Sequence, residues 1–280
     1  MDSTRPSRGA APDTSVVSGF SRESVTVSRP STLLESALRF NRTPILLLLV
    51  LLPAVSWLWI VVMARDMYGP MTGASAWMMT PRWDVSHLLL LWAMWAVMMT
   101  AMMLPSASPL VLLYGAAVRR TLPGRIYALA GGYLALWTLF SLAATVIQRV
   151  LASLLLLSPM MEAASSRTAA ALLVVAGVYQ LTPAKRACLR ACQSPLGFLM
   201  SHWRDGLSGA FRMGLEHGMH CVGCCWALML LLFAGGVMNL AVIAALTAFV
   251  ALEKFVSVGR RGAAVSGILL LAAALWVAFH

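Results

Sequence analysis

Long apolar segments recur along the chain and are separated by short polar connections. Hydrophobic residues make up 60% of the 280 residues, and charged residues make up only 11%. A soluble domain carries about 25% charged residues, so this chain would expose large apolar surfaces to water. Helices of about 20 apolar residues can instead span a bilayer, because each helix satisfies its own backbone hydrogen bonds. The sequence therefore predicts an all-α, polytopic transmembrane helical bundle.

Seven apolar segments are predicted to span the membrane, and six spans remain an alternative because the fourth segment is the weakest. The segments are 45–63, 87–104, 126–147, 166–182, 214–234, 238–256 and 263–279. The run 150–157 is either an interfacial helix or an extension of the third span. One transmembrane domain thus covers residues 45–280, and the Ser-, Pro- and Arg-rich residues 1–44 are predicted to form a disordered cytoplasmic tail.

The distribution of basic residues favours one orientation of these spans. The formal net charge is +11, but most of the 21 Lys and Arg residues lie in the tail and in the second, fourth and sixth loops. Cytoplasmic loops of membrane proteins carry such an excess. We therefore expect a multi-pass protein of the bacterial inner (plasma) membrane with a cytoplasmic N-terminus, whose partner is the lipid bilayer and not nucleic acid.

The fifth predicted span carries the most distinctive chemistry. Residues 213–229 read MGLEHGMHCVGCCWALM. At about 100° per residue, two imidazoles and three thiols fall on one helix face. These are the side chains of His217, His220, Cys221, Cys224 and Cys225. Thiolate and imidazole ligands suit copper(I), which we favour, and also zinc or iron. Polar groups are costly against lipid, so this face should line the bundle interior; the alternative is that these side chains only pack between helices.

Two further features accompany this face. Glu216 is predicted to orient an imidazole as a carboxylate behind the metal ligands, or to accept a proton. Gly214 and Gly218 form a pair of small residues one turn apart, which lets the backbone of another helix come close. We therefore expect a partner helix to pack against the side of the fifth span that carries these glycines.

The second predicted span is rich in methionine, with Met94, Met98 and Met102 on one face. Thioether sulfur is a soft ligand for copper(I), although methionine also fills gaps in membrane cores. If the second and fifth spans pack antiparallel and side by side, Met102 lies near the level of His217, Met98 near Cys221 and Met94 near Cys225. Such packing would extend the donor set across two helices.

The fourth loop contains a second pair of thiols, Cys188 and Cys192, which share a face if this stretch is helical. The neighbouring Lys185, Arg186 and Arg190 are expected to lower the thiol pKa by favouring the thiolate. The pair would then accept or donate a soft metal. An interfacial helix whose cations meet anionic lipid is the equal alternative.

Three stretches resemble an uncharacterised bacterial family of predicted metal-binding integral membrane proteins. They are MMTAMMLPSASP (98–109), LTPAKRACLRACQSPLGFL (181–199) and GLEHGMHCVGCCWALMLLLFAGGVMN (214–239). The similarity extends from about residue 45 to the C-terminus and implies a metal site at the His217–Cys225 cluster, with Cys188 and Cys192 as candidates.

Three classes of function remain open. We favour a copper(I) transporter or a factor that delivers the ion to or from a metal chaperone or a membrane metalloenzyme, without enzymatic activity of its own. An enzyme, as a membrane thiol or metal redox protein, is the second class. A structural assembly subunit is the third class, and metal content would separate it from the others.

Overall fold

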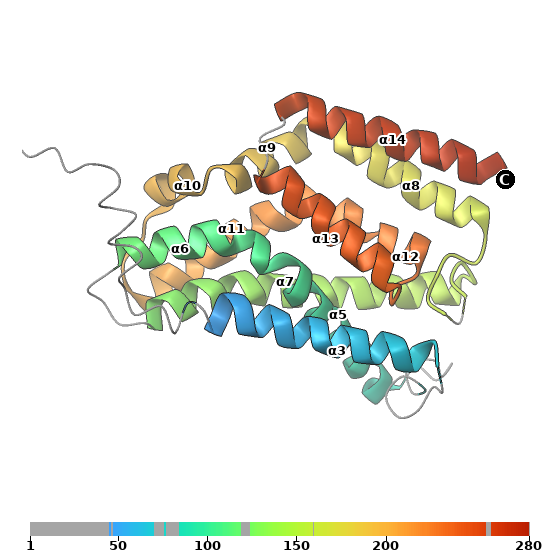
Figure 1. Cartoon of the computed structure of the whole chain (residues 1–280), viewed down its shortest axis with the longest axis horizontal. Coiled ribbons are helices and arrows are strands. Elements are labelled where there is room, and N and C mark those ends of the chain that lie inside the picture. The colour runs from blue at the N-terminus through green and yellow to red at the C-terminus, as the bar shows by residue number, and fades with distance from the viewer. Residues whose placement is uncertain are drawn as a thin grey trace, which may run out of the picture. The chain divides into compact units, whose positions relative to one another are not determined.

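The structure is a computed structural model that describes residues 45, 47–69, 76, 84–118, 124–158, 160–255 and 259–279. The chain divides into two compact units, Met1–Arg39 and Phe40–His280, and all described residues belong to the second. The predicted tail, residues 1–44, lies outside the described residues. The described part is all-α, as predicted (Figure 1), with a single isolated bridge between Leu157 and Ala163.

The helices follow the apolar segments and are interrupted where proline removes a backbone donor. A π-helical turn, η1 (Leu47–Leu51), leads into α3 (Leu52–Met67), which has Pro53 in its first turn. α5 (Val85–Met103) ends just before Pro105, which opens the short 3-10 helix η2 (Pro105–Ala107). The remaining helices are α6 (Ser108–Ala117), α7 (Gly124–Ser153), α8 (Ser166–Leu181), α9 (Pro183–Gln193), α10 (Pro195–His202), α11 (Gly206–Met229), α12 (Leu231–Gly235), α13 (Leu240–Phe255) and α14 (Gly259–Phe279).

Five helical segments of the described residues are long and apolar enough to cross a membrane. They are Leu47–Met67, Val85–Met103, Gly124–Ser153, Gly206–Gly235 and Gly262–Phe279. The fourth and sixth predicted spans correspond to α8 and α13, which have 16 residues each. At about 1.5 Å per residue such a helix is about 24 Å long, short of the roughly 30 Å hydrocarbon core. The structure thus confirms a multi-pass helical protein but not the count of seven. It also shows the start of the run 150–157 as an extension of α7.

α7 and α11 form the most closely packed helix pair of the fold. A Cβ atom added to Gly214 would lie 1.9 Å from the carbonyl oxygen of Leu129, and one added to Gly132 would lie 2.0 Å from that of Phe211. One added to Gly218 would lie 3.2 Å from Leu136 Cβ. The close approach predicted from Gly214 and Gly218 is confirmed, and α7 is the partner.

The predicted side-by-side packing of the second and fifth spans is wrong. α5 and α11 each pack along α7, not extensively along one another. The register between α5 and α11 also differs from the prediction. The hydroxyl of Tyr133 in α7 donates to the carbonyl of Met103 at 2.9 Å and lies 3.0 Å from Cys221 Sγ. Residue 103, not 98, therefore lies at the level of Cys221. The physical reason is that the backbone contacts at Gly132 and Gly214 bring α7 against α11.

Several shorter helices end where α11 carries its cysteines. The end of α5 reaches this level through Met103, the end of α13 through Lys254, and the end of α8 through Tyr179, whose hydroxyl donates to the carbonyl of Gly223. The earlier part of α11 packs into a second, smaller apolar cluster together with α6, α10 and the start of α7. Its buried members include Tyr114, Leu129, Phe198, Leu199 and Met213. The cysteines therefore lie where this cluster meets the main core.

Candidate metal centre

The face of α11 predicted to point inward does so. His217, Cys221, Cys224 and Cys225 are buried with at most 3% of their surfaces exposed, and His220 is half-buried. Met219, on the opposite side of the same helix, is 62% exposed. The amphipathic pattern of the sequence was sufficient to predict this orientation.

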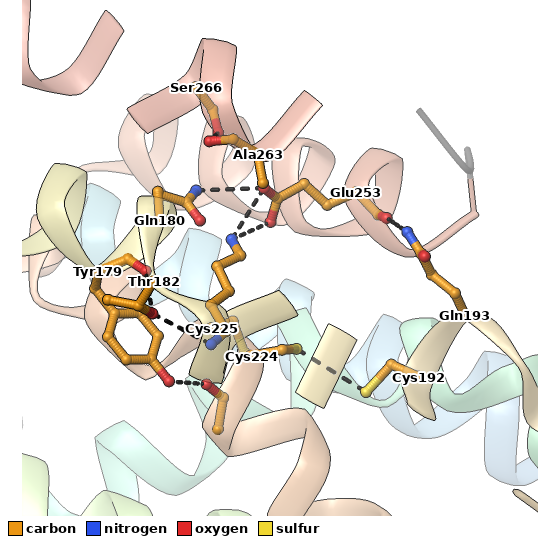
Figure 2. Close-up of polar contacts among 12 residues, drawn as sticks. Tyr179, Gln180, Thr182, Cys192, Gln193, Cys224, Cys225, Glu253, Ala263 and Ser266 are labelled. Carbon is orange, nitrogen blue, oxygen red and sulfur yellow. Dashed lines mark hydrogen bonds and ion pairs between the residues drawn. The ribbon is translucent and has the colours of Figure 1, made fainter. Parts of the chain in front are cut away.

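The thiols of the fourth loop lie against those of α11. α9 is helical, as the shared face of Cys188 and Cys192 required, and it packs on α11. Cys192 Sγ lies 3.9 Å from Cys224 Sγ (Figure 2). A Cβ atom added to Gly223 would lie 2.7 Å from Cys188 Sγ, so this thiol occupies the space that the glycine leaves open. Cysteines distant in sequence thus converge at one helix crossing, which the sequence did not reveal.

The thiols of Cys224 and Cys225 bond to the backbone of their own helix. All five cysteines are free thiols, and those of Cys224 and Cys225 donate to the carbonyl of Cys221 at 3.1 Å and 3.0 Å. Within the described residues, no three His, Cys, Asp or Glu side chains are placed to hold a metal ion together. A metal site shared by all five α11 side chains therefore stays a prediction.

Lys254 of α13 is the unexpected member of the site. Its ammonium lies 2.9 Å from Cys221 Sγ and donates to Ser106 Oγ at 2.7 Å. Among the basic residues assigned to the sixth loop from the sequence, Lys254 is instead buried, with 6% of its surface exposed. The signal was an ionisable residue at the end of an apolar segment, which in membrane proteins marks functional positions. Tyr133 and Ser106, the other polar contacts, had no such signal.

A buried ion pair fixes α9 in place. Lys185 Nζ donates to the two carboxylate oxygens of Glu253 at 2.9 Å and 2.7 Å, and the lysine side chain is fully buried. Gln180 Nε2 donates to the same carboxylate at 3.3 Å, and Gln193 Nε2 donates to the Glu253 carbonyl at 2.7 Å (Figure 2). α13 therefore holds α9 through Glu253 and contacts Cys221 through the adjacent Lys254.

The predicted lowering of the thiol pKa in α9 is wrong. Burial raises the pKa of Cys188, and hydrogen bonds with the thiols of Cys221 and Cys224 raise the pKa of Cys192. One of the three neighbouring cations, Lys185, is instead paired with Glu253. Charge proximity along the sequence was therefore a poor guide to electrostatics in space.

Glu216 does not orient an imidazole through its carboxylate. Arg204 donates to its Oε1 at 2.9 Å, and Arg212 lies 3.6 Å away, one helical turn earlier. His220 instead contacts the backbone carbonyl of Glu216 through Nδ1 at 2.8 Å. Both arginine contacts are to Oε1, and Oε2 is buried without a hydrogen-bond partner among the described residues, so the predicted role of Glu216 as a proton acceptor stays a prediction.

The remaining predicted ligands are buried, and no hydrogen bond joins them to the thiols within the part of the chain that the structure describes. Met94, Met98 and Met102 belong to the main core cluster, together with Cys221. His217 packs against the rings of Tyr133 and Phe198, with centroids 5.9 Å and 5.1 Å away. Its Nδ1 is buried without a hydrogen-bond partner among the described residues. A ligand role for these four residues stays a prediction.

The fold and the site together define a multi-pass helical membrane protein with a cluster of thiols at a helix crossing. The family model described as PpoB2, copper chaperone, matches residues 92–277, which include every element of this cluster. The chain belongs to this copper chaperone family. No curated protein and no solved structure matches the chain.

Proposed function

We propose that this protein carries Cu(I) between the thiols of α9 and α11 and delivers it to a metalloenzyme or to another metal chaperone. The observation that carries the proposal is the 3.9 Å distance between Cys192 Sγ and Cys224 Sγ. Two sulfurs that share one ion with metal–sulfur bonds of about 2.3 Å lie at most about 4.6 Å apart. The pair can thus hold one ion without moving its helices, and thiolates are soft ligands that suit Cu(I).

The other thiols would allow the ion to be exchanged. Cys188 lies against Gly223, one residue before Cys224, and Cys221 and Cys225 lie on the same buried face. A chaperone must bind its cargo selectively and still release it, and neighbouring thiols offer alternative ligands of similar strength. Cys224 and Cys225 would leave the carbonyl of Cys221 when they bind the ion. Met94, Met98, Met102, His217 and His220 are proposed as later positions of the ion.

Lys254 balances the charge of such a site. Cu(I) held by two thiolates leaves one net negative charge, and a buried net charge is costly. The ammonium of Lys254 is adjacent to Cys221 and supplies the compensating positive charge. The same ammonium can balance one thiolate before copper arrives. We therefore assign Lys254 the role of counter-ion in both states.

Orientation follows from the basic loops. With a cytoplasmic N-terminus and seven spans, of which α8 and α13 are the two short ones, α9 and the thiol crossing lie toward the cytoplasmic side of the inner membrane. Copper would enter the site from this side. The partner that receives the copper would then lie within the membrane or on its other side.

A thiol–disulfide oxidoreductase is the second candidate, and the same sulfur pair favours it. Cys192 and Cys224 are free thiols on different helices. A disulfide requires sulfurs about 2 Å apart, so the two sulfurs would have to move about 2 Å closer. The copper proposal requires no such movement.

The test is Cu(I) binding to the full-length protein purified in detergent, measured by competition with a chromophoric Cu(I) ligand. We expect tight binding that falls at least tenfold in Cys192→Ser and in Cys224→Ser. Met219→Ser is the matched control, because it removes an exposed sulfur from the opposite face of α11. A protein that binds no copper but forms a reversible Cys192–Cys224 disulfide would replace the chaperone proposal with the redox one.

A further inference from the structure

Three imidazoles surround the ring of Phe198, which α10 inserts beside α11. His202 of α10 stacks on Phe198 with ring centroids 4.5 Å apart, and the rings of His217 and His220 lie 5.1 Å and 6.0 Å from it. His202 and His220 face one another with ring centroids 6.4 Å apart. His202 was not among the ligands predicted from the sequence, because its helix is separate from α11.

The backbone fixes which nitrogen of these two rings carries the proton. His220 Nδ1 contacts the carbonyl of Glu216 at 2.8 Å, and a carbonyl can only accept, so Nδ1 donates. His202 Nδ1 likewise contacts the carbonyl of Phe198 at 3.2 Å. Ser201 Oγ, 2.8 Å from the same nitrogen, donates to the carbonyl of Gly197 and can accept from Nδ1. In the neutral form of both rings, Nε2 therefore keeps its lone pair.

This is the arrangement that metal-binding histidines adopt. Such histidines donate one ring N–H to a carbonyl, which fixes the ring and leaves the other nitrogen for the metal. With metal–nitrogen bonds of about 2 Å, two imidazoles on opposite sides of one ion have ring centres about 6 Å apart. The 6.4 Å between His202 and His220 is close to this separation.

We infer that His202 and His220 form a second Cu(I) site, separate from the thiol crossing, with His217 as a neighbouring third imidazole. Two imidazoles with a third beside them favour a low-coordinate monovalent ion, because zinc in proteins takes four ligands, and Oε1 of the nearby Glu216 carboxylate is paired with Arg204 and Arg212. Imidazole binds Cu(I) less firmly than thiolate does, so this site would load second or pass the ion onward. The inference rests on the proposed copper function.

The experiment is a stoichiometric Cu(I) titration of the full-length protein in detergent, with competitors of two different strengths. We expect the unmodified protein to bind two ions, one tightly and one weakly. His202→Ala and His220→Ala should each lose the weak ion and keep the tight one, whereas Cys192→Ser should weaken the tight one. His87→Gln is the matched histidine control, because His87 lies in the first turn of α5, sixteen residues from the Met103 end.

X-ray absorption spectroscopy of the second bound equivalent of copper gives an independent readout, since nitrogen and sulfur neighbours of the ion scatter differently. Nitrogen neighbours in the unmodified protein, lost in His202→Ala while the detergent-purified variant stays monodisperse, support the site. Two ions retained in both histidine variants, or only sulfur neighbours, would overturn it and leave the chaperone proposal intact. A protein that binds no Cu(I) at all would overturn both proposals.

Discussion

The ammonium of Lys254 lies 2.9 Å from the sulfur of Cys221, with Ser106 Oγ as its other hydrogen-bond partner at 2.7 Å. Among the described residues, no salt bridge joins Lys254 to a carboxylate. A buried ammonium needs a compensating charge, and Cys221, as the thiolate, is the group placed to supply it.

Replacing Lys254 with methionine keeps the length of the side chain and removes its charge. We expect Lys254→Met to weaken Cu(I) binding at least tenfold, equivalent to about 1.4 kcal/mol, because a copper–dithiolate would then be left with a buried negative charge. Lys254→Arg, which keeps the charge, should lose less. Competition titration with a chromophoric Cu(I) ligand measures both, and equal affinity in Lys254→Met would refute the counter-ion role.

The Lys185–Glu253 pair is predicted to hold α9 against the bundle. Glu253→Gln leaves Lys185 buried without its carboxylate, and we expect it to lower the free energy of unfolding by about 3 kcal/mol. The double variant Lys185→Met/Glu253→Leu should recover most of this loss, because an apolar pair of similar volume carries no desolvation cost. Thermal unfolding in detergent compares the variants. A double variant no more stable than Glu253→Gln would contradict the explanation.

Neighbouring glycines of α7 provide a matched test of the α7–α11 contact. A Cβ atom at Gly132 would lie 2.0 Å from the Phe211 carbonyl, whereas one at Gly131 has nothing within 4 Å. We expect Gly132→Ala to destabilise the protein by about 2 kcal/mol, because two backbones must separate. Gly131→Ala should be neutral or stabilising by about 0.5 kcal/mol through helix propensity. Unfolding temperatures that shift equally in both variants would argue against the contact.

The reactivity of the Cys188 thiol distinguishes a pKa raised by burial from a pKa lowered by the neighbouring cations. Burial raises the pKa of this thiol, so less thiolate is present at neutral pH than in an exposed cysteine. We expect its alkylation by iodoacetamide to be slow at neutral pH and to rise only at a more alkaline pH than glutathione requires. Mass spectrometry of the α9 peptide gives the rate at each pH. A rise at lower pH than glutathione would restore the influence of the neighbouring cations.

The fold class and the direction of the α11 face were predictable from periodicity. Apolar segments long enough to span a bilayer must be helical there, because a helix satisfies its own backbone hydrogen bonds. The spacing of His217, Cys221, Cys224 and Cys225 places their side chains on one face of a helix. The glycine pair at Gly214 and Gly218 likewise predicted a close helix contact. These features are local, because the period of a single helix decides them.

The identity of the partners was not predictable in the same way. Gly214 indicated that another helix would pack closely against α11, but the spacing of the glycines did not indicate whether that helix would be α7 or α5. The length of α13 was also overestimated, since apolar composition does not mark the residue at which a helix ends, whereas α8 ends within one residue of the predicted span.

The chain's own pattern of apolar, thiol and imidazole residues determined that it would be a helical membrane protein with an inward-facing donor stripe. Tertiary structure alone decided that Cys192 meets Cys224, that Lys254 meets Cys221 and that His202 meets His220. The reason is that a helix repeats about every 3.6 residues and so orders its own side chains, whereas contacts between helices depend on backbone approach and on buried ion pairs between segments far apart in sequence.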